Sequence, residues 1–354
     1  MPTLEIPQRG IPEALAHLAG KPLAGCETLG EGRNSRVYKA IGDDGRPYLA
    51  KHYFRHQADA RDRLQVEFSS LQFLWNHGVR AIPQPIAAEW TARWALYEYV
   101  EGTRVSPDSV TPREIGMAVS FLSALKALRN QPASRHCPIA SEACFSIHAI
   151  LEQLEARMRR FPSDDGTQAH LAALHAFLRE TFLPARQTIR AWCEARSEQW
   201  GMSLTRELRD EDKTLSPSDF GFHNAIRRPD GRLVFVDFEY FGWDDPAKMI
   251  VDVPLHPAMT LSDALKQNFV AQLLPCFDDP ETLMRRVRVV YPLWGLKWCL
   301  ILLNEFVPSD RLRRGFAKPA VAERDDVSHR QLAHAQQLLQ RLLQEYDHFP
   351  YGSF

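Results

Sequence analysis

The hydrophobic and polar positions of the first hundred residues follow the period of strands more often than that of helices. A short helix is expected over 11–19, with Gly20 just beyond its end. Strand-like runs then cover 36–41 and 48–54, on either side of an Asp-Asp-Gly turn. This pattern predicts an antiparallel hairpin near the start of the chain.

One helix and one further strand complete this part of the chain. The helix is predicted by apolar residues that share one helical face, namely Leu64, Phe68, Leu71 and Trp75. Gly78 ends that pattern. After a Pro-Gln-Pro break, the apolar and aromatic run 94–100 predicts another strand, which ends at Glu101-Gly102.

Beyond Gly102 the helical period dominates. Helices are predicted over 115–128, 147–160, 171–182, 298–303 and 331–346. The helical pattern is interrupted once, over 215–241, where 233–236 has the character of a strand. We therefore expect an α+β fold with two lobes, a small antiparallel sheet in 1–101 and a larger, mainly helical lobe in 102–354.

Composition limits the classes of protein that fit this pattern. The 354 residues are enough for two lobes, and an apolar share of 45% is typical of an ordinary globular protein. Lys and Arg number 43 against 44 Asp and Glu, which gives a formal net charge of −1. This balance argues against a nucleic acid or a membrane surface as the main partner, although a local basic patch stays open.

The cysteines and the N-terminal residues indicate the cellular compartment in which the protein is expected. The six cysteines lie far apart, without the spacing of a zinc site, and suggest free thiols in a reducing compartment. The first twenty residues contain charged residues and prolines where a signal peptide needs an apolar run. A cytoplasmic protein is expected, and the oligomeric state stays open.

A glycine-containing turn precedes the hairpin. Gly30 and Gly32 stand two residues apart, and Ser35 follows just before the first predicted strand of the hairpin. Glycine lets a turn approach phosphate oxygens closely and offer them its N–H groups. Since such pairs are also common in plain hairpin turns, a phosphate loop and a simple turn both remain open.

Lys51 stands inside an apolar strand, where an unpaired ammonium would cost several kcal/mol to bury. Glu67 borders the apolar face of the following helix and could supply the partner. The alternative is a lysine that points to water and a surface glutamate. The pair alone does not decide between these interpretations.

The strongest signal lies in the interruption of the helical part. Asp219 is followed five residues later by Asn224, and Asp237 ends the apolar strand thirteen residues after that. A carboxylate and an amide oxygen suit Mg²⁺, which takes few protein ligands and completes its octahedron with phosphate oxygens and water. The remaining acid would be free to orient and deprotonate a hydroxyl group.

Taken in order, these motifs resemble those of the aminoglycoside phosphotransferase and choline kinase-like family, relatives of the protein kinases. The resemblance covers about residues 29–253 and implies a bilobal protein-kinase-like fold. It implies that Lys51 holds nucleotide phosphates and pairs with Glu67. It further implies that Asp219 is the catalytic base, and that Asn224 and Asp237 hold Mg²⁺.

The resemblance also implies which nucleotide binds and which residues between the two lobes contact it. Backbone groups of Glu98 and Val100 would meet the adenine of ATP, with GTP as an alternative, and Ser35 would serve in place of the third glycine. Asp245-Pro246 is predicted to cap and begin a helix, as in the Gly-Asp-Pro motif of small-molecule kinases. The segment after Asp237 has no room for the activation segment of a protein kinase.

One position departs from the family pattern. The family usually has a histidine two residues before the catalytic aspartate, and here that residue is Pro217. The histidine mainly supports the loop, so its loss removes neither the base nor a metal ligand. His223 could take over some of its hydrogen bonds, or could simply be packed in the loop.

The expected function is transfer of the γ-phosphoryl group of ATP to a hydroxyl group of a small molecule, such as an amino alcohol, a sugar or an aminoglycoside-like compound. A nucleotide-binding scaffold without turnover is the alternative that Pro217 suggests, and a protein kinase is a third. Five residues could favour a cationic or polyhydroxylated acceptor but also fit the core or a helix cap: Glu239, Asp244, Trp243, Trp294 and Trp298.

Overall fold

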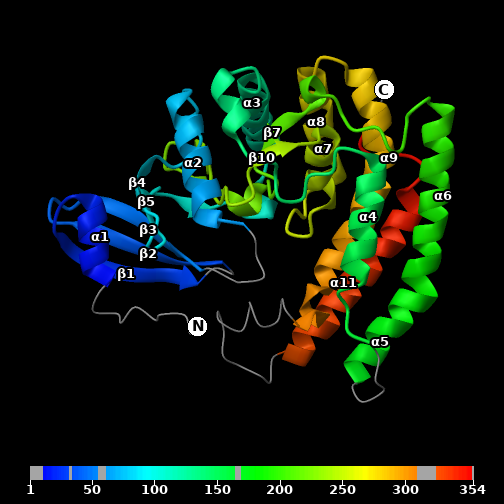
Figure 1. Ribbon diagram of the computed structural model, residues 1–354, viewed down its shortest axis with the longest axis horizontal. Coiled ribbons are helices and arrows are strands. Elements are labelled where there is room, and N and C mark those ends of the chain that lie inside the picture. The colour runs from blue at the N-terminus through cyan, green and yellow to red at the C-terminus, as the bar shows by residue number, and fades with distance from the viewer. Residues whose placement is uncertain (1–10, 32–33, 55–60, 164–168, 309–323, 353–354) are drawn as a thin grey trace.

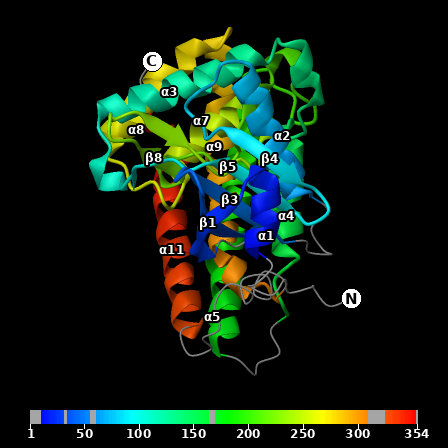
Figure 2. The ribbon, with the colours of Figure 1, turned by 90° about the vertical axis from the view of Figure 1, so that its left-hand side faces the viewer.

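The computed structural model describes residues 11–31, 34–54, 61–163, 169–308 and 324–352. In these residues the chain forms a β-sheet lobe and a larger helical lobe, as predicted, and Figure 1 shows them side by side. In Figure 2 the β-sheet lobe faces the reader and the helical lobe lies behind it.

The N-terminal sheet is antiparallel and has the strand order β1-β2-β3-β5-β4. The strands are β1 (Leu23–Glu31), β2 (Ser35–Gly42), β3 (Pro47–Tyr53), β4 (Pro85–Glu89) and β5 (Trp94–Glu98). The predicted hairpin is confirmed as β2 and β3, which pair Val37 with Lys51. Strands β1 and β4 were not predicted from the sequence.

Two helices cover opposite faces of this sheet. Helix α1 (Ile11–Ala19) contacts β1, β4 and β5, and α2 (Arg63–Asn76) contacts β4 and β5. Successive side chains of a strand point to opposite faces, so Ala50 joins the cluster under α1 while Tyr53 packs with α2. The same alternation turns Lys51 toward α2.

The helical lobe is built around one long helix, α9 (Pro280–Leu302), which packs on α4, α6, α7 and α11. The helices of this lobe are α3 (Pro112–Leu128), α4 (Ile147–Met158), α5 (Ala169–Phe177), α6 (Leu183–Gln199), α7 (Pro246–Leu255), α8 (Asp263–Leu273), α9 and α11 (Arg324–Glu345). The single helix expected over 171–182 is α5 followed by a π-helical turn, Leu178–Phe182, that leads directly into α6.

Short strands frame the interruption of the helical pattern. A three-stranded sheet joins β6 (Thr103–Arg104), β8 (Ala225–Arg227) and β9 (Leu233–Phe235), and β7 (Thr214–Ser216) pairs with β10 (Gly242–Asp244). The strand expected at 233–236 is confirmed as β9. Between the two lobes, β5 ends at Glu98 and β6 begins at Thr103. A boundary at Glu101-Gly102 stays a prediction.

Helix α9 and the turn after it, Pro280–Phe306, are long and apolar enough to cross a membrane by length and composition. Of the apolar window in this segment, 72% is buried inside the protein. The apolar residues of α9 are therefore used as the centre of the helical lobe.

Gly102 connects the two lobes in a conformation that disfavours other residues. Its φ is 150°, and a Cβ at this position would lie 2.2 Å from the carbonyl oxygen of Arg227 in β8. We predict that Gly102→Ala lowers the free energy of unfolding by more than about 1 kcal/mol, because the β6–β8 pairing must shift.

Urea unfolding measures this loss. Gly25→Ala in β1 is the matched control, because a Cβ there meets no atom within 4 Å. The control should change the free energy of unfolding by no more than about 1 kcal/mol. Equal stability of the two variants would contradict the prediction.

Candidate active site

Lys51 and Glu67 form a buried ion pair between β3 and α2. The Lys51 Nζ lies 2.8 and 3.0 Å from the two carboxylate oxygens of Glu67. The Tyr53 hydroxyl donates to Glu67 Oε2 at 2.6 Å. The structure therefore decides between the two interpretations of this pair, since neither side chain points to water.

Asp237 joins this pair from the helical lobe. Its Oδ1 lies 3.2 Å from the Lys51 Nζ, and its side chain remains 39% exposed. Burial disfavours the Lys51 ammonium, but the carboxylates of Glu67 and Asp237 outweigh this effect and raise the pKa of Lys51 above its ordinary value. Asp237 has a φ of 69°, a conformation uncommon outside glycine that is often found at functional sites.

Asp219 and Asn224 lie in the loop between β7 and β8. The Asn224 Nδ2 donates to the carbonyl oxygen of Asp219 at 3.0 Å, and the Asn224 carbonyl accepts from the Val236 N–H at 2.9 Å. These contacts place Asn224 beside both Asp219 and Asp237, as the sequence predicted. Since Nδ2 is used within the loop, the amide oxygen Oδ1 is left for a ligand.

The donor set suits a magnesium ion. Asp237 offers a partly exposed carboxylate and Asn224 an amide oxygen, and such hard oxygen ligands are those that Mg²⁺ takes in proteins. Lys51 lies against the same carboxylate, so a nucleotide phosphate at this place would meet a fixed positive charge.

Lys248 holds the loop between β7 and β8 that carries Asp219, and it was not predicted from the sequence. The completely buried Nζ of this α7 lysine lies 3.0 Å from the Ser218 hydroxyl and 3.3 Å from the Ser218 carbonyl oxygen. It also lies 2.6 Å from Asp244 and 3.4 Å from Asp252. A lysine four residues from an acid on each side, within an apolar helix, is the signal that could have revealed it.

Two histidines approach the carboxylate of Asp219. His256 Nε2 lies 3.2 Å and His223 Nε2 lies 3.4 Å from Asp219 Oδ1. Burial favours the neutral carboxyl, but the imidazole rings of His223 and His256 beside it hold the pKa of Asp219 well below its ordinary value. Asp219 therefore stays charged. Neither ring nitrogen of His223 makes a hydrogen bond among the described residues, and its ring stacks on that of His256, so His223 is packed in the loop. No local sequence pattern pointed to His256.

The glycine turn is described only in part. Gly32 lies outside the described residues. Gly30 pairs with Val37 inside β1, next to an irregularity in the register, so it belongs to the strand and not to the turn itself. Ser35 is buried at the start of β2, where it pairs with Tyr53.

The segment between the lobes partly fits the expected hinge. The Glu98 N–H donates to the Gln84 carbonyl at 2.8 Å, which leaves it unavailable to a nucleotide. The Glu98 side chain accepts from Arg228 of the helical lobe at 2.6 Å. Val100 is buried, and within the described part of the chain its N–H has no hydrogen-bond partner.

The residues that could favour a cationic acceptor are mostly used inside the protein. Glu239 is buried, with Oε1 2.7 Å from Arg63 and 2.5 Å from the Asn34 amide nitrogen. Burial and the neighbouring Asp237 raise the pKa of Glu239 to about 7. Asp244 pairs with Lys248, as described above. Neither acid is free to recognise an acceptor.

Of the three tryptophans suggested for an acceptor site, two are used mainly in packing and hydrogen bonds inside the protein. Trp294 is buried and donates to Asp252 at 2.6 Å, and Trp243 donates to the Ser134 carbonyl at 3.1 Å. Trp298 alone among the three both stays partly exposed and lies next to the Asp219 cluster, with its ring 4.5 Å from that of His256. The predicted cap is confirmed, since Asp245 accepts from the Ala247 N–H at 2.8 Å at the start of α7.

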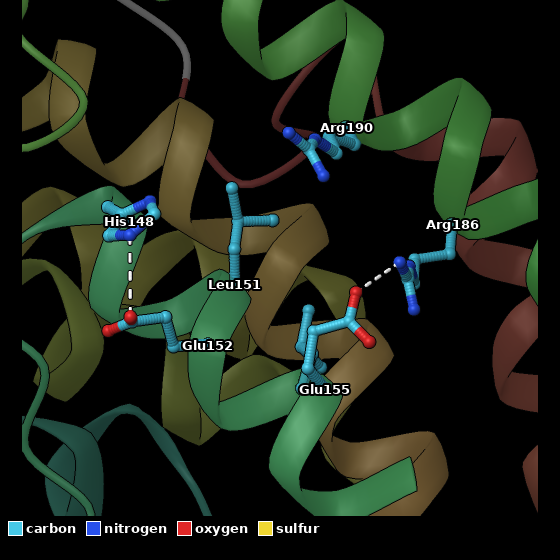
Figure 3. Close-up of a pocket in the computed structure, with 7 residues that line it drawn as sticks. His148, Leu151, Glu152, Glu155, Arg186 and Arg190 are labelled. Carbon is cyan, nitrogen blue, oxygen red and sulfur yellow. Dashed lines mark hydrogen bonds and ion pairs between the residues drawn. The ribbon is translucent and has the colours of Figure 1, made fainter. Parts of the chain in front are cut away.

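Two cavities lie away from these residues. A cavity of about 100 Å³ between α4 and α6 is lined by charged side chains that pair with one another, as His148 does with Glu152 and Arg186 with Glu155 (Figure 3). A larger cavity of about 660 Å³ lies along α3 and β9, and none of the predicted site residues lines it.

A β-sheet lobe and a helical lobe that meet at a lysine, a glutamate and an acid-amide-acid cluster define a protein-kinase-like fold. A family model described as "Phosphotransferase enzyme family" matches residues 25–281. The chain therefore belongs to the phosphotransferase enzyme family, and the expectation of an enzyme that transfers phosphoryl groups is confirmed. A comparison with curated proteins finds no significant match.

Solved structures support the same fold. The spectinomycin phosphotransferase APH(9)-Ia, solved with ADP and spectinomycin, is similar with a TM-score of 0.65 and 11% identity, over 95% of this chain and 99% of that one. The choline kinase LicA from Streptococcus pneumoniae gives 0.59 and 15%, over 94% and 99%. An ethanolamine kinase from Plasmodium vivax gives 0.56 and 13%, over 90% and 83%.

The loss of Lys248 is expected to lower the stability of the protein strongly. We predict that Lys248→Met lowers the free energy of unfolding by about 3–5 kcal/mol, because it leaves the carboxylates of Asp244 and Asp252 buried without a counter-charge. Urea unfolding measures the change.

Arg190→Met on α6 provides the control, since Arg190 and its partner Glu194 are 50% and 40% exposed. The control should cost no more than about 1 kcal/mol. If Lys248→Met is no more damaging than this control, the buried network does not support the loop.

Proposed function

We propose that the protein transfers the γ-phosphoryl group of ATP to a hydroxyl group of a small molecule. The observation that carries the proposal is the contact of Lys51 with both Glu67 and Asp237, which joins the two lobes at one charged site. GTP is the alternative nucleotide. Membership of the phosphotransferase enzyme family supports the reaction class.

Lys51 would hold the α- and β-phosphates of the nucleotide, with Glu67 keeping its ammonium in place. Val100 would offer its free N–H to the adenine, and the Glu98 carbonyl would be its partner. Asn224 and Asp237 would hold Mg²⁺, which neutralises charge on the phosphates as the bond to the leaving group breaks. Gly30 in β1, Ser35 at the start of β2 and Gly32, which stands between them in the sequence, would cover the phosphates.

Asp219 would act on the acceptor. Its charged carboxylate accepts the proton of the acceptor hydroxyl while the hydroxyl oxygen forms a bond to the γ-phosphorus and ADP leaves. A low pKa suits a group that mainly orients the hydroxyl and takes its proton late in the reaction. Such positioning accounts for most of the catalysis expected of a kinase.

The acceptor would be a small amino alcohol, sugar or aminoglycoside-like compound. Support comes from the similar structures, whose names refer to spectinomycin, choline and ethanolamine. A screen of these compounds and of a wider set of metabolites, with γ-labelled ATP, identifies the acceptor. Transfer to none of them would argue for the scaffold interpretation that Pro217 suggested.

One prediction of this proposal concerns the base. Asp219→Asn should reduce phosphoryl transfer by at least about 100-fold, because the amide cannot accept the proton, while the affinity for MgATP stays within about threefold. Rates with labelled ATP and calorimetry measure the two effects. Full transfer by this variant would overturn the assignment of Asp219.

A separate prediction of this proposal concerns the metal. Asp237→Ala should lose the Mg²⁺-dependent part of nucleotide binding, because a ligand of the ion and the counter-charge of Lys51 are both removed. Calorimetry with ATP, in the presence of Mg²⁺ or of EDTA, measures this part directly. An unchanged dependence on Mg²⁺ would show that Asp237 is not a ligand.

A further inference from the structure

His256 lies at the end of α7, far along the chain from the loop that carries Asp219. Its Nε2 is 3.2 Å from Asp219 Oδ1. Its ring stacks on that of His223, with the ring centroids 4.2 Å apart and the planes 16° apart. Two imidazole rings thus meet the same carboxylate oxygen, and among the described residues none bonds to the other oxygen, Oδ2.

The position of the proton on His256 follows from its second ring nitrogen. The Ala258 N–H lies 3.1 Å from His256 Nδ1 and can only donate, so Nδ1 must accept. A neutral imidazole carries its proton on the other nitrogen. His256 Nε2 is therefore the donor in the bond to Asp219.

The ring of His256 is also fixed mechanically. Its backbone N–H donates to the Asp252 carbonyl at 2.8 Å, and its ring meets the edge of Trp298. The indole N–H of Trp298 in turn donates to the Asp252 carboxylate at 3.0 Å. Helices α7 and α9 together therefore hold the donor in one place.

The alternative interpretation of the cluster of Asp219, His223 and His256 is a metal site. One atom each of Asp219, His223 and His256 lie within 4.8 Å of one another, which is close enough to hold an ion. A metal would need the lone pair of His256 Nε2, and the ring proton would then move to Nδ1, against the Ala258 N–H. The geometry favours the hydrogen bond.

We propose that His256 is a positioning residue for the Asp219 base. Its Nε2–H fixes Oδ1, so that Oδ2 faces the hydroxyl of the acceptor. The position two residues before the base, where a histidine usually supports the loop, holds Pro217, which has no donor. This proposal rests on the proposed function, because it requires that Asp219 is the base.

Three substitutions at His256 separate positioning from packing. Gln places its amide nitrogen near the position of Nε2 and keeps a donor for Asp219. Asn is too short to reach Asp219 but keeps an acceptor for the Ala258 N–H. Leu fills the space and does neither.

We expect His256→Asn and His256→Leu to lower kcat by about 10–100-fold, with KM for ATP and acceptor within about threefold of the wild type, and His256→Gln to recover most of the loss. Turnover of MgATP is measured with the acceptor that the screen returns and with water. Full kcat in His256→Asn would overturn the proposal. If His256→Leu fails to fold, the comparison of Gln with Asn still decides.

Two further measurements keep the proposals distinguishable. In an Asp219→Asn background, His256→Leu should cause no further loss, because there is no base to position. Nitrogen NMR of the wild-type ring should detect the proton on Nε2, and a proton on Nδ1 alone would overturn the positioning role. Full transfer by Asp219→Asn, or no turnover by the wild type on any acceptor, would overturn the proposed function as well.

Discussion

The buried ammonium of Lys248 is the constraint on which the site depends. Burying an unpaired charge costs several kcal/mol, so the surrounding groups must satisfy it. They come from three places in the chain: Ser218 in the loop between β7 and β8, Asp244 at the end of β10, and Asp252 in α7. Asp252 then accepts from two tryptophans of α9. The Lys248 ammonium, through Asp252, thus connects the loop between β7 and β8 to helix α9.

Much of the fold and of the site could be predicted from the sequence, because those features depend on local periods. The β2–β3 hairpin, α2 and the cap at Asp245 follow from alternation, helical spacing and capping chemistry. Strands β1 and β4 have no clear alternation, and they form only because neighbouring strands offer them partners. The pair of Lys51 and Glu67 needed the structure, since either side chain could have faced water.

The residues that were not predicted contact the Asp219 loop from a part of the chain that is distant in sequence. His256 and Lys248 reach the loop only after α7 has folded back against it. The contact of His256 leaves no local pattern in the sequence, whereas Lys248 is marked by an acid four residues away on each side. The sequence also suggested two acids for binding an acceptor, and the structure shows that they are used inside the protein. Glu239 and Asp244 have suitable charges, but the protein uses both to neutralise its own buried cations. The composition alone could not reveal such internal pairing.

The contacts of Glu239 also have a consequence for the rates at which a nucleotide would bind and dissociate. A single carboxylate oxygen accepts from Asn34, beside the glycine turn, and from Arg63 at the start of α2. The two lobes are therefore tied together before any ligand arrives. A binding site that is already assembled loses little affinity to conformational change. If the nucleotide binds between the lobes as proposed, these two hydrogen bonds would have to open for it to enter or leave, which would slow its exchange.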